Sequence, residues 1–519
     1  LRDAVKDMAS TMATLERVLA LDPSSAQEKL RAESRFKPTL IAADIDRRAV
    51  AYLEEHRLEL PGVRVEAVPR RRYPLGSLGS HFLGHLGEIT EGYLRQSANG
   101  DYRQGDIIGV YGLERDFERY LKGTKGFKRV EVDAYGRELR LLFNKDQIPG
   151  NTLILTIDLE LQKRAAELFS PYQGALIAMD PRNGQILAMV SNPSFDPNLF
   201  AGGISRENWQ KLMRNPLHPL HNRALQGQYP PGSVYKIVVA AAGLEEGVIT
   251  PDTTIYDPGY FYFGRRTYRD WKPGGHGIVD LKKAIRESCD VYFYRLGQKL
   301  GIDRMARYAR GFGLGKKTGL SMRDEREGVV PSRKWKRAAR GEPWYPGETI
   351  SAAIGQGFNL VTPIQLLNVM ASVANGGTLY RPHLVQRVLS PEGREVYRAR
   401  PEVLGRLPVR ARNLRLIQEA LRAVVNERGG TAFRARLKEV VVAGKTGTAQ
   451  VMRLRRRGGQ DKLPREQRDH GWFVAYAPFE NPSIAVIVFV EHGGKHGAYY
   501  APLAMKLIQA YLKLREEKA

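Results

Sequence analysis

Cysteine is almost missing from this sequence, because Cys289 is the only one in 519 residues. A single thiol excludes an intramolecular disulfide and leaves the redox compartment open. Acidic residues are also scarce, since 56 Asp and Glu face 81 Lys and Arg and leave a formal charge of +25. The excess is scattered apart from short clusters such as residues 70–72 and 455–457. A scattered excess is typical of a solvated surface, and no nucleic-acid-binding module accompanies it, so we expect no nucleic-acid partner.

Long apolar runs are missing as well. The longest, residues 237–244 and 484–490, are far shorter than the roughly 18 residues that a membrane span requires. No signal peptide is visible. The chain begins with Leu1 rather than Met, and we expect that an N-terminal piece has been removed.

A strong chain break at Pro149, Gly150 and Asn151 predicts a domain boundary just after it. The chain is too long for one compact core, so we expect an N-terminal domain of residues 1–155 and a second domain of residues 156–519. In the first domain the patterns predict helices within residues 1–21 and 45–58, a strand at 63–68, and strand segments over 127–142 with a turn at Tyr135 and Gly136.

The second domain combines strands from both of its ends. We expect strands at residues 153–157, 175–179, 186–190, 472–476 and 484–490, helices at 159–169 and 501–514, and a mostly helical middle. A sheet built from both ends of a domain, with helices between, predicts an α+β layered fold.

Ser233 and Lys236 form the first pattern that suggests chemistry. The turn residues 229–232 precede them, and an apolar run follows that predicts a buried helix. A serine in the first turn and a lysine three residues later share one helix face, so the amine can accept the hydroxyl proton. The same short pattern occurs at residues 34–37 without an apolar helix behind it. Taken alone, Ser233 is equally well explained as a helix cap.

Ser288, Cys289 and Asp290 form a second pattern, between the amphipathic stretches 281–287 and 291–300. A hydroxyl and a carboxylate at this place can pass and orient protons. The pattern is weak by itself, because other segments of the chain match it loosely.

Lys445, Thr446, Gly447 and Thr448 directly follow the apolar residues 440–444. A strand that ends in these residues would project a cation and two hydroxyls along a sheet edge. Such an edge accepts an extended peptide as an added strand, with its carboxylate near Lys445. Gly447 would let the peptide backbone approach closely.

The three patterns become specific in combination, because they follow one another in order within one domain. Ser-x-x-Lys, Ser-x-Asn and Lys-Thr-Gly mark penicillin-binding proteins and serine β-lactamases. Further segments resemble class B penicillin-binding proteins, namely residues 109–114, 174–190, 354–357, 362–363, 374–377 and 444–450. The segments at residues 257–259, 269–271, 275–277 and 288–290 resemble the elongation-type, penicillin-binding protein 2 group. The resemblance covers nearly the whole chain.

This resemblance implies a fold and an activity. It implies an elongated, non-catalytic pedestal domain, followed by a penicillin-binding/β-lactamase-like transpeptidase domain whose antiparallel sheet is sandwiched by helices and carries an all-helical subdomain. The implied activity is peptidoglycan D,D-transpeptidation of stem peptides during cell-wall elongation. β-Lactams would acylate the same serine and stay attached.

The resemblance also implies roles for the motif residues. Ser233 attacks the carbonyl between two terminal D-alanines, Lys236 takes its proton, and Ser288 relays a proton to the leaving group. The substrate carboxylate binds Lys445, Thr446 and Thr448, while the backbone amides of Ser233 and Thr448 hold the oxyanion.

Asp290 departs from the pattern, because most of the superfamily has Asn at this position. An ionised carboxylate cannot donate a hydrogen bond. We therefore expect Asp290 to pair with Lys236 or Lys445. The elongation group resembles this sequence here, so the departure does not indicate an inactive enzyme.

Asp257, Asp270, His276 and Cys289 lie in the segments that resemble the elongation group, some members of which hold zinc near the active site. One thiolate, one imidazole and two carboxylates form an acceptable closed tetrahedral set. The resemblance thus implies a structural zinc that braces the loop of Ser288 and Asp290, whereas the chemistry itself requires no cofactor. The residues are equally compatible with a buried free cysteine, a hydrogen-bonded histidine and two turn aspartates.

Other functions use the same residues. A serine β-lactamase is compact and needs no pedestal, whereas a D,D-carboxypeptidase differs only in using water as the acceptor. A non-enzymatic β-lactam sensor or wall-binding scaffold would be acylated without turnover. The sequence does not separate the carboxypeptidase from the transpeptidase.

The resemblance finally implies a location and partners. We expect a single membrane anchor preceding this chain, with the catalytic domain on the outer side of the cytoplasmic membrane. The expected partners are a SEDS-type (RodA-like) glycosyltransferase and other elongation proteins. The charged residues 453–468 are expected to form a solvated loop.

Overall fold

The computed structural model describes residues 5, 7–22, 30, 39–96, 102–132, 138–451 and 460–517. They divide into two compact units, Leu1–Arg71 with Gly123–Pro149, and Arg72–Lys122 with Gly150–Ala519. The expected turn at Tyr135 and Gly136 and the first part of the expected loop at residues 453–468 lie outside the described residues.

The smaller unit contains helices α1 (Met8–Leu19) and α3 (Arg47–Glu55) and the antiparallel strands β3 (Phe127–Val132) and β4 (Glu138–Lys145). Asp7 and Asp46 cap the two helices by accepting hydrogen bonds from backbone amides. The helices bury a small core of Met12, Leu15, Leu53 and Leu60.

The strand expected at residues 63–68 is wrong, because this segment forms no strand. In the described part of this unit, β3 and β4 form a two-stranded sheet, and neither pairs with this segment. Val63 and Val65 pack partly buried against the small core, but Ala67 and Val68 are exposed, so the segment buries only part of the face that its alternating pattern marks.

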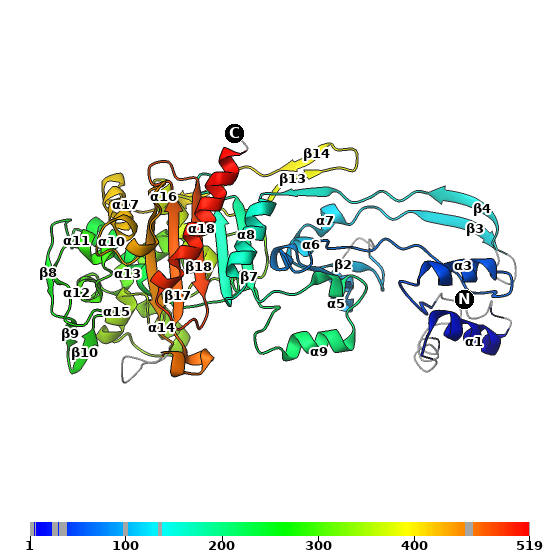
Figure 1. Ribbon diagram of the computed structural model, residues 1–519, viewed down its shortest axis with the longest axis horizontal. Helices are drawn as coiled ribbons and strands as arrows, with labels where there is room; N and C mark the ends of the chain where they lie inside the picture. Colours follow the sequence, from blue (N-terminus) through cyan, green and yellow to red (C-terminus); the bar gives the residue numbers. More distant parts are fainter. Residues whose placement is uncertain are drawn as a thin grey trace. The chain divides into compact units, whose positions relative to one another are not determined.

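The larger unit is built on a five-stranded antiparallel sheet in the order β16-β17-β18-β6-β7 (Figure 1). Its strands are β6 (Gly174–Met179), β7 (Ile186–Asn192), β16 (Ala443–Ala449), β17 (His470–Ala477) and β18 (Ile484–Val490). Strands from both ends of the domain thus share one sheet, which confirms the predicted α+β arrangement. Helices α8 (Leu159–Phe169) and α18 (Gly497–Glu516) pack on one face, and α16 (Pro363–Ala374) packs on the other.

The helical part of this unit lies between β7 and β16 in the sequence. It comprises α9 (Arg206–Arg214), the 3-10 turn η3 (Gly232–Tyr235), α10 (Lys236–Glu245), α11 (Leu281–Arg286), α12 (Asp290–Leu300), α13 (Ile302–Gly311), α14 (Arg333–Arg340), α15 (Pro346–Ala353) and α17 (Ala411–Asn426). Two short ribbons accompany these helices, β8 (Ile255–Asp257) with β11 (Gly277–Val279) and β9 (Tyr260–Phe263) with β10 (Arg266–Arg269). Helix α10 is buried over most of its length, because its apolar residues face α12, α13 and α17 at once.

The remaining elements extend the larger unit beyond the central sheet. They are α4 (Ser80–Leu83), β1 (His85–Glu88), α5 (Glu91–Gln96), β2 (Ile107–Tyr111), α6 (Gly112–Asp116), α7 (Glu118–Leu121), β5 (Thr152–Leu155), β12 (Thr378–Tyr380), β13 (Val385–Leu389), β14 (Glu395–Arg398) and β15 (Val403–Arg406). Residues 72–122 are joined to the rest of the unit by polar contacts, such as the ion pair between Arg115 and Asp324 (2.9 Å).

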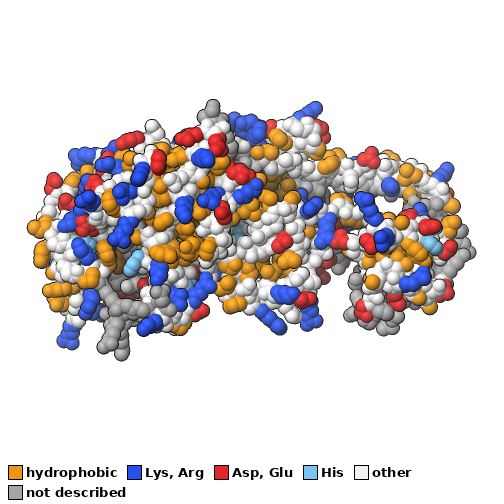
Figure 2. All heavy atoms as spheres, in the orientation of Figure 1, with side chains coloured by type: hydrophobic (Ala, Val, Ile, Leu, Met, Phe, Trp, Pro, Cys, Tyr) orange, Lys and Arg blue, Asp and Glu red, His pale blue; other side chains and the backbone are white. Residues whose placement is uncertain are grey.

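Positive charge is scattered over the visible surface, as the sequence indicates (Figure 2). Lys and Arg side chains are spread over the visible face and alternate with acidic and apolar side chains (Figure 2). Within the described ranges, no helix has both the length and the apolar character needed to cross a membrane.

Candidate active site

Ser233 lies in the 3-10 turn η3, directly before the buried helix α10. The turn packs against the edge strand β16 so closely that a Cβ on Gly232 would lie 2.6 Å from the backbone oxygen of Thr448. Gly232 also has a φ of +53°, so glycine is required here for both space and backbone conformation. The half-buried Ser233 is therefore held beside the end of the Lys-Thr-Gly-Thr segment.

Strand β16 carries Lys445, Thr446, Gly447 and Thr448 and ends one residue later, at Ala449. The expected strand, which ran from residue 440 and ended in Lys445–Thr448, therefore begins too early, because pairing with β17 begins only at Ala443. Among the strands of the described residues, β16 pairs with β17 alone, so its other edge can accept an added strand.

The three sequence patterns meet at two buried amines. Lys236 Nζ donates hydrogen bonds to Ser288 O (2.8 Å), Ser288 Oγ (3.3 Å) and Asp290 Oδ1 (2.7 Å). Lys445 Nζ donates to Ser288 Oγ (2.8 Å) and to Thr446 O (3.1 Å). The Ser288 hydroxyl thus lies between both amines, and we call Lys236, Ser288, Asp290 and Lys445 the catalytic cluster.

Asp290 pairs with Lys236, one of the two partners that the sequence left open. Lys236 makes no hydrogen bond to Ser233 among the contacts of the described residues, although the two were expected to share a helix face. Its three bonds to the Ser288 loop satisfy the ammonium group, because an ammonium carries three donors.

The backbone of Ser288 is strained. Its φ of +58° lies in the left-handed region, which is rare for residues other than glycine. The bonds from Lys236 to its carbonyl and from Lys445 to its hydroxyl hold it there. The turn between α11 and α12 therefore presents the hydroxyl of Ser288 to both amines.

Burial dominates the electrostatics of the catalytic cluster. Both lysine side chains are fully buried. Burial, together with the nearby positive charge of Lys236, lowers the pKa of Lys445 well below its usual value, while Asp290 opposes this shift. A neutral amine at Lys445 is the species that can accept a proton.

Several neighbours of this site were assigned no role from the sequence. Thr431 is 2.7 Å from Thr446 through their hydroxyls, and Phe293 lies under Lys236 with its ring centre 5.4 Å from Nζ. Gln356 Nε2 donates to Thr448 O at 3.1 Å. These contacts join segments that are far apart in the chain, so local sequence patterns do not predict them. The glycines on either side of Gln356 are the one local feature that indicated a tight loop.

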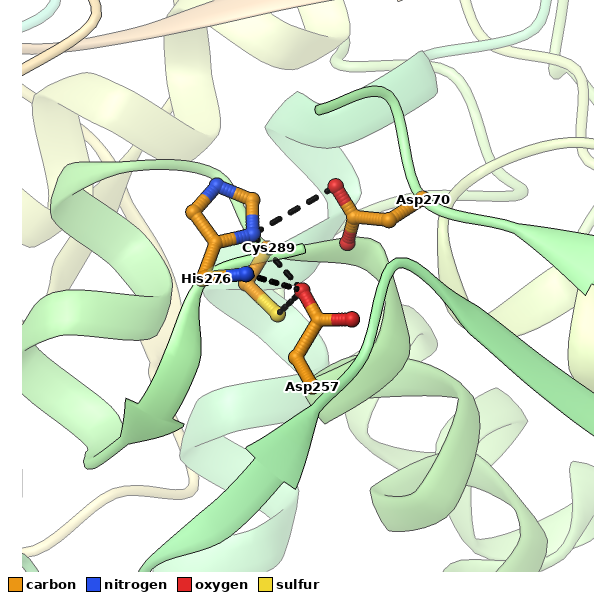
Figure 3. A group of neighbouring side chains, drawn as sticks. All are labelled: Asp257, Asp270, His276 and Cys289. Carbon is orange, nitrogen blue, oxygen red and sulfur yellow. Dashed lines mark hydrogen bonds and ion pairs between the residues drawn. The ribbon is translucent and has the colours of Figure 1, made fainter. Parts of the chain in front are cut away.

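The four expected metal ligands lie together in one buried group (Figure 3). We call Asp257, Asp270, His276 and Cys289 the acidic cluster. His276 Nδ1 is 2.7 Å from Asp257 Oδ2 and 3.4 Å from Asp270 Oδ1, and Cys289 Sγ is 3.3 Å from Asp257 Oδ2. One ligand atom from each residue lies within 4.8 Å of all the others, and all four residues are buried. The cluster thus supplies the four ligands that a closed tetrahedral zinc site requires.

Burial disfavours the charged forms of two groups in the acidic cluster, the Cys289 thiol and the Asp270 carboxyl. Burial, reinforced by the charge of Asp270, raises the pKa of the Cys289 thiol far above its usual range. Burial and the charge of Asp290 also raise the pKa of Asp270. Burial opposes ionisation of Asp257, but hydrogen bonds from His276 and Gly259 outweigh it and keep its pKa low. A bound cation would remove these penalties, because it favours thiolate and carboxylate.

The acidic cluster is tied to the catalytic loop through Asp270. Its Oδ2 accepts hydrogen bonds from the backbone amides of Asp290 (2.7 Å) and Val291 (3.2 Å). Cys289 is also the N-cap of α12 and accepts from the amide of Tyr292. Any change in the acidic cluster therefore reaches Ser288 and Asp290 directly.

Comparisons with known proteins place these features in a wider context. Residues 2–155 match the penicillin-binding protein dimerisation domain family, and residues 174–509 match the penicillin-binding protein transpeptidase domain family. The peptidoglycan D,D-transpeptidase MrdA of Acinetobacter baumannii is 37% identical over 522 residues, which cover 99% of this chain and 77% of that protein.

Solved structures that resemble this chain include a penicillin-binding protein and a chain of a peptidoglycan synthase complex. The penicillin-binding protein PBP2 of Helicobacter pylori, in a complex with MreC, has a TM-score of 0.86 at 31% identity, and the match covers 98% of this chain and 92% of that one. A chain in a peptidoglycan synthase complex that coordinates polymerization and crosslinking has a TM-score of 0.75 at 34% identity, covering 96% of this chain and 85% of that one.

Proposed function

This chain belongs to the penicillin-binding protein transpeptidase family, in the group of the MrdA relatives, and from that membership we propose how its residues cross-link peptidoglycan. It is a serine-type D,D-transpeptidase. The observation that carries the proposal is the convergence of Lys236, Ser288 and Lys445 beside the turn of Ser233.

The first step acylates the enzyme. Ser233 Oγ attacks the carbonyl carbon between the two terminal D-alanines of a stem peptide, and its proton passes to Lys236. Lys236 is free to accept it once its own proton has moved through the Ser288 hydroxyl to the neutral amine of Lys445. Collapse of the tetrahedral intermediate breaks the C–N bond, and the departing D-alanine amine takes up a proton through Ser288.

The second step transfers the acyl group. An amine of a neighbouring stem peptide attacks the ester carbonyl and loses a proton to Lys236, and Ser233 Oγ leaves with a proton. In both steps the backbone amides of Ser233 and Thr448 bind the oxyanion. Each such donor typically lowers the barrier by roughly 3–4 kcal/mol.

Lys445, Thr446 and Thr448 bind the terminal carboxylate of the donor peptide. The open edge of β16 supports this role, because it offers two hydroxyls and a buried amine to an added strand. Binding of the carboxylate also favours the protonated form of Lys445, which draws the proton from the Ser288 hydroxyl at the right moment. A β-lactam copies the donor peptide but keeps its leaving group attached, so the acyl-enzyme persists.

Labelling with a fluorescent penicillin tests the nucleophile. We expect a stable adduct of the wild-type chain, seen by gel and by intact mass, and none with Ser233→Ala. Ser205→Ala, which removes the exposed N-cap serine of α9, is the control and keeps the adduct. An adduct that persists in Ser233→Ala would refute the assignment. With glycan strands as substrate, release of D-alanine without cross-linked dimers would instead indicate a carboxypeptidase, and an adduct without any turnover would indicate a sensor.

A zinc ion held by Asp257, Asp270, His276 and Cys289 would have a structural role, since four protein ligands close its coordination shell. It would supply the positive charge that the acidic cluster lacks. The residues themselves then hold the catalytic loop, through the bonds of Asp270 to Asp290 and Val291.

The proposal also includes the roles of the two domains, the membrane location and the protein partners. Residues 1–155 act as a non-catalytic pedestal and residues 156–519 as the transpeptidase domain, and a single anchor outside this chain holds them on the outer side of the cytoplasmic membrane. The structures of related chains with MreC and in a peptidoglycan synthase complex support elongation partners, including a SEDS-type (RodA-like) glycosyltransferase. Co-purification of the membrane-anchored protein with such a glycosyltransferase, and its loss on deleting residues 1–71, which lie outside the compact unit of the catalytic sheet, tests this part.

A further inference from the structure

Gln356 lies in a tight loop between α15 and α16, and none of the steps above uses it. Its side-chain amide donates a hydrogen bond to the backbone oxygen of Thr448 at 3.1 Å. The two residues are 92 positions apart in the sequence. Gln356 therefore joins this loop to the open edge of β16.

The same loop also holds the turn of the nucleophile. The backbone amide of Gly232 donates to Gly355 O at 3.0 Å. A Cβ on Gly355 would lie 2.2 Å from Gly232 O, and its φ is +73°, so the close approach requires glycine. Two neighbouring residues of one loop thus contact the two segments that carry Ser233 and Thr448.

The loop is itself well anchored. The buried Asn359 donates from Nδ2 to Gln356 O (3.0 Å) and to Ala352 O (3.1 Å). The backbone amide of Gln356 donates to Ser351 O at 3.1 Å. Because its backbone is fixed, the half-buried side chain of Gln356 reaches Thr448 from a rigid base.

The bond to Thr448 O also reports where the amide of Thr448 points. In an extended strand, the N–H and C=O of one residue face the same neighbouring position. Since the carbonyl of Thr448 faces Gln356 at the open edge, its N–H faces that edge too, on the side of the nucleophile turn.

We propose that Gln356 is a positioning residue of the oxyanion hole, because it fixes Thr448 relative to the turn that carries Ser233. The inference rests on the proposed function, in which the amides of Ser233 and Thr448 stabilise the oxyanion. In this proposal Gln356 bonds to Thr448 O and not to a reacting atom. It acts through the direction of the Thr448 amide.

Two variants of the full chain test this role. Gln356→Met keeps the length of the side chain and removes the donor. Gln356→Glu keeps the shape and, when ionised, presents only acceptors to Thr448 O. Saturation kinetics with benzylpenicillin separate the dissociation constant of the first complex from the acylation rate constant. We expect the acylation rate constant to fall about 10–100-fold in Gln356→Met and further in Gln356→Glu, because a misplaced donor loses part of its 10²–10³-fold effect.

A boronic acid provides a readout that a purely structural role would not change. It forms a tetrahedral adduct on the nucleophilic serine and places an oxygen where the oxyanion forms. We expect its affinity to fall by the same factor as the acylation rate constant. The dissociation constant of the benzylpenicillin complex, the final adduct stoichiometry and the melting temperature should remain near the wild-type values.

Gln418→Ala is the matched control, because Gln418 is another half-buried glutamine whose amide donates to a backbone oxygen, that of Val373 at 2.7 Å. It should leave acylation unchanged. Wild-type acylation and boronate affinity in both Gln356 variants would overturn the proposal. A lower adduct stoichiometry with a normal rate in the remaining fraction would overturn it as well, because that result indicates loss of folding only. Failure of the proposed function is distinguishable, since the wild-type chain itself would then form no adduct or Ser233→Ala would keep it.

Discussion

The catalytic cluster and the acidic cluster lie side by side but differ in charge balance. In the catalytic cluster, Lys236 and Asp290 neutralise each other, and Ser288 joins them to Lys445. In the acidic cluster, two carboxylates face one imidazole and one thiol, and the pKa values of Asp270 and Cys289 are raised by burial. The comparison teaches that the first cluster pairs an acid with a base inside the protein, whereas the second would gain positive charge only from the proposed zinc.

The largest expected effect comes from a substitution in the catalytic cluster. Lys236→Ala removes the proposed base and leaves the half-buried Asp290 without its cation, so acylation by penicillin should slow by about 10²–10⁴-fold. Stopped-flow acylation measures this rate. Lys336→Ala is a matched control, because Lys336 is an equally buried lysine bound to Glu348 instead of Ser288. It should lower the melting temperature without slowing acylation of the folded fraction. A normal acylation rate in Lys236→Ala would contradict the base assignment.

The second expected effect is that of removing the proposed zinc from the acidic cluster. If zinc is bound at 100–1,000 times its dissociation constant, a chelator should lower the free energy of unfolding by about 3–4 kcal/mol. Urea unfolding with and without chelator, together with metal analysis of protein purified without a His-tag, measures this change. The chelator should have no effect on Cys289→Ser. Substoichiometric zinc in the wild type that is unchanged in Cys289→Ser would exclude the site.

The third effect concerns a histidine outside both clusters. Burial lowers the pKa of His81 to about 4, despite its bond to Pro193 O. Because the folded pKa lies below the unfolded value of 6.5, its contribution to stability is full above pH 6.5 and is lost as the pH falls towards 4. At 1.36 kcal/mol per pKa unit, the free energy of unfolding should fall by about 3 kcal/mol over this pH range.

Urea unfolding of chelator-treated protein at pH 7 and pH 4.5 measures this third effect without interference from a metal. His81→Gln should flatten the pH dependence, whereas the exposed His496→Gln should not. An unchanged acid slope in His81→Gln would show that other groups cause it.

The smallest effect sharpens the role of the sheet edge. Thr446→Val removes a hydroxyl that is proposed to bind the substrate carboxylate and that contacts Thr431 at 2.7 Å. One hydrogen bond contributes about 1 kcal/mol, so the dissociation constant of the penicillin complex should rise about 5-fold. Thr446→Ser keeps the hydroxyl and should restore binding. Equal weakening in both variants would indicate that packing, and not the hydroxyl, is responsible.

Local patterns in the sequence predicted much of the fold. The strands at residues 175–179 and 484–490 and the helix at residues 159–169 are confirmed, because burial and capping act over neighbouring residues. The strand predicted at residues 63–68 is wrong, and β16 begins later than predicted. Both errors concern pairing, which depends on a partner strand that lies elsewhere in the chain.

The sequence by itself determined which residue types carry the chemistry, since Ser233 with Lys236 and the run from Lys445 to Thr448 are recognisable within a few positions. Only the tertiary structure decided that Asp290 pairs with Lys236, that the pKa of Lys445 is lowered, and that Gln356 holds Thr448. The physical reason is that these three features depend on distance and burial between segments 54 to 157 residues apart, and local spacing carries no information about either.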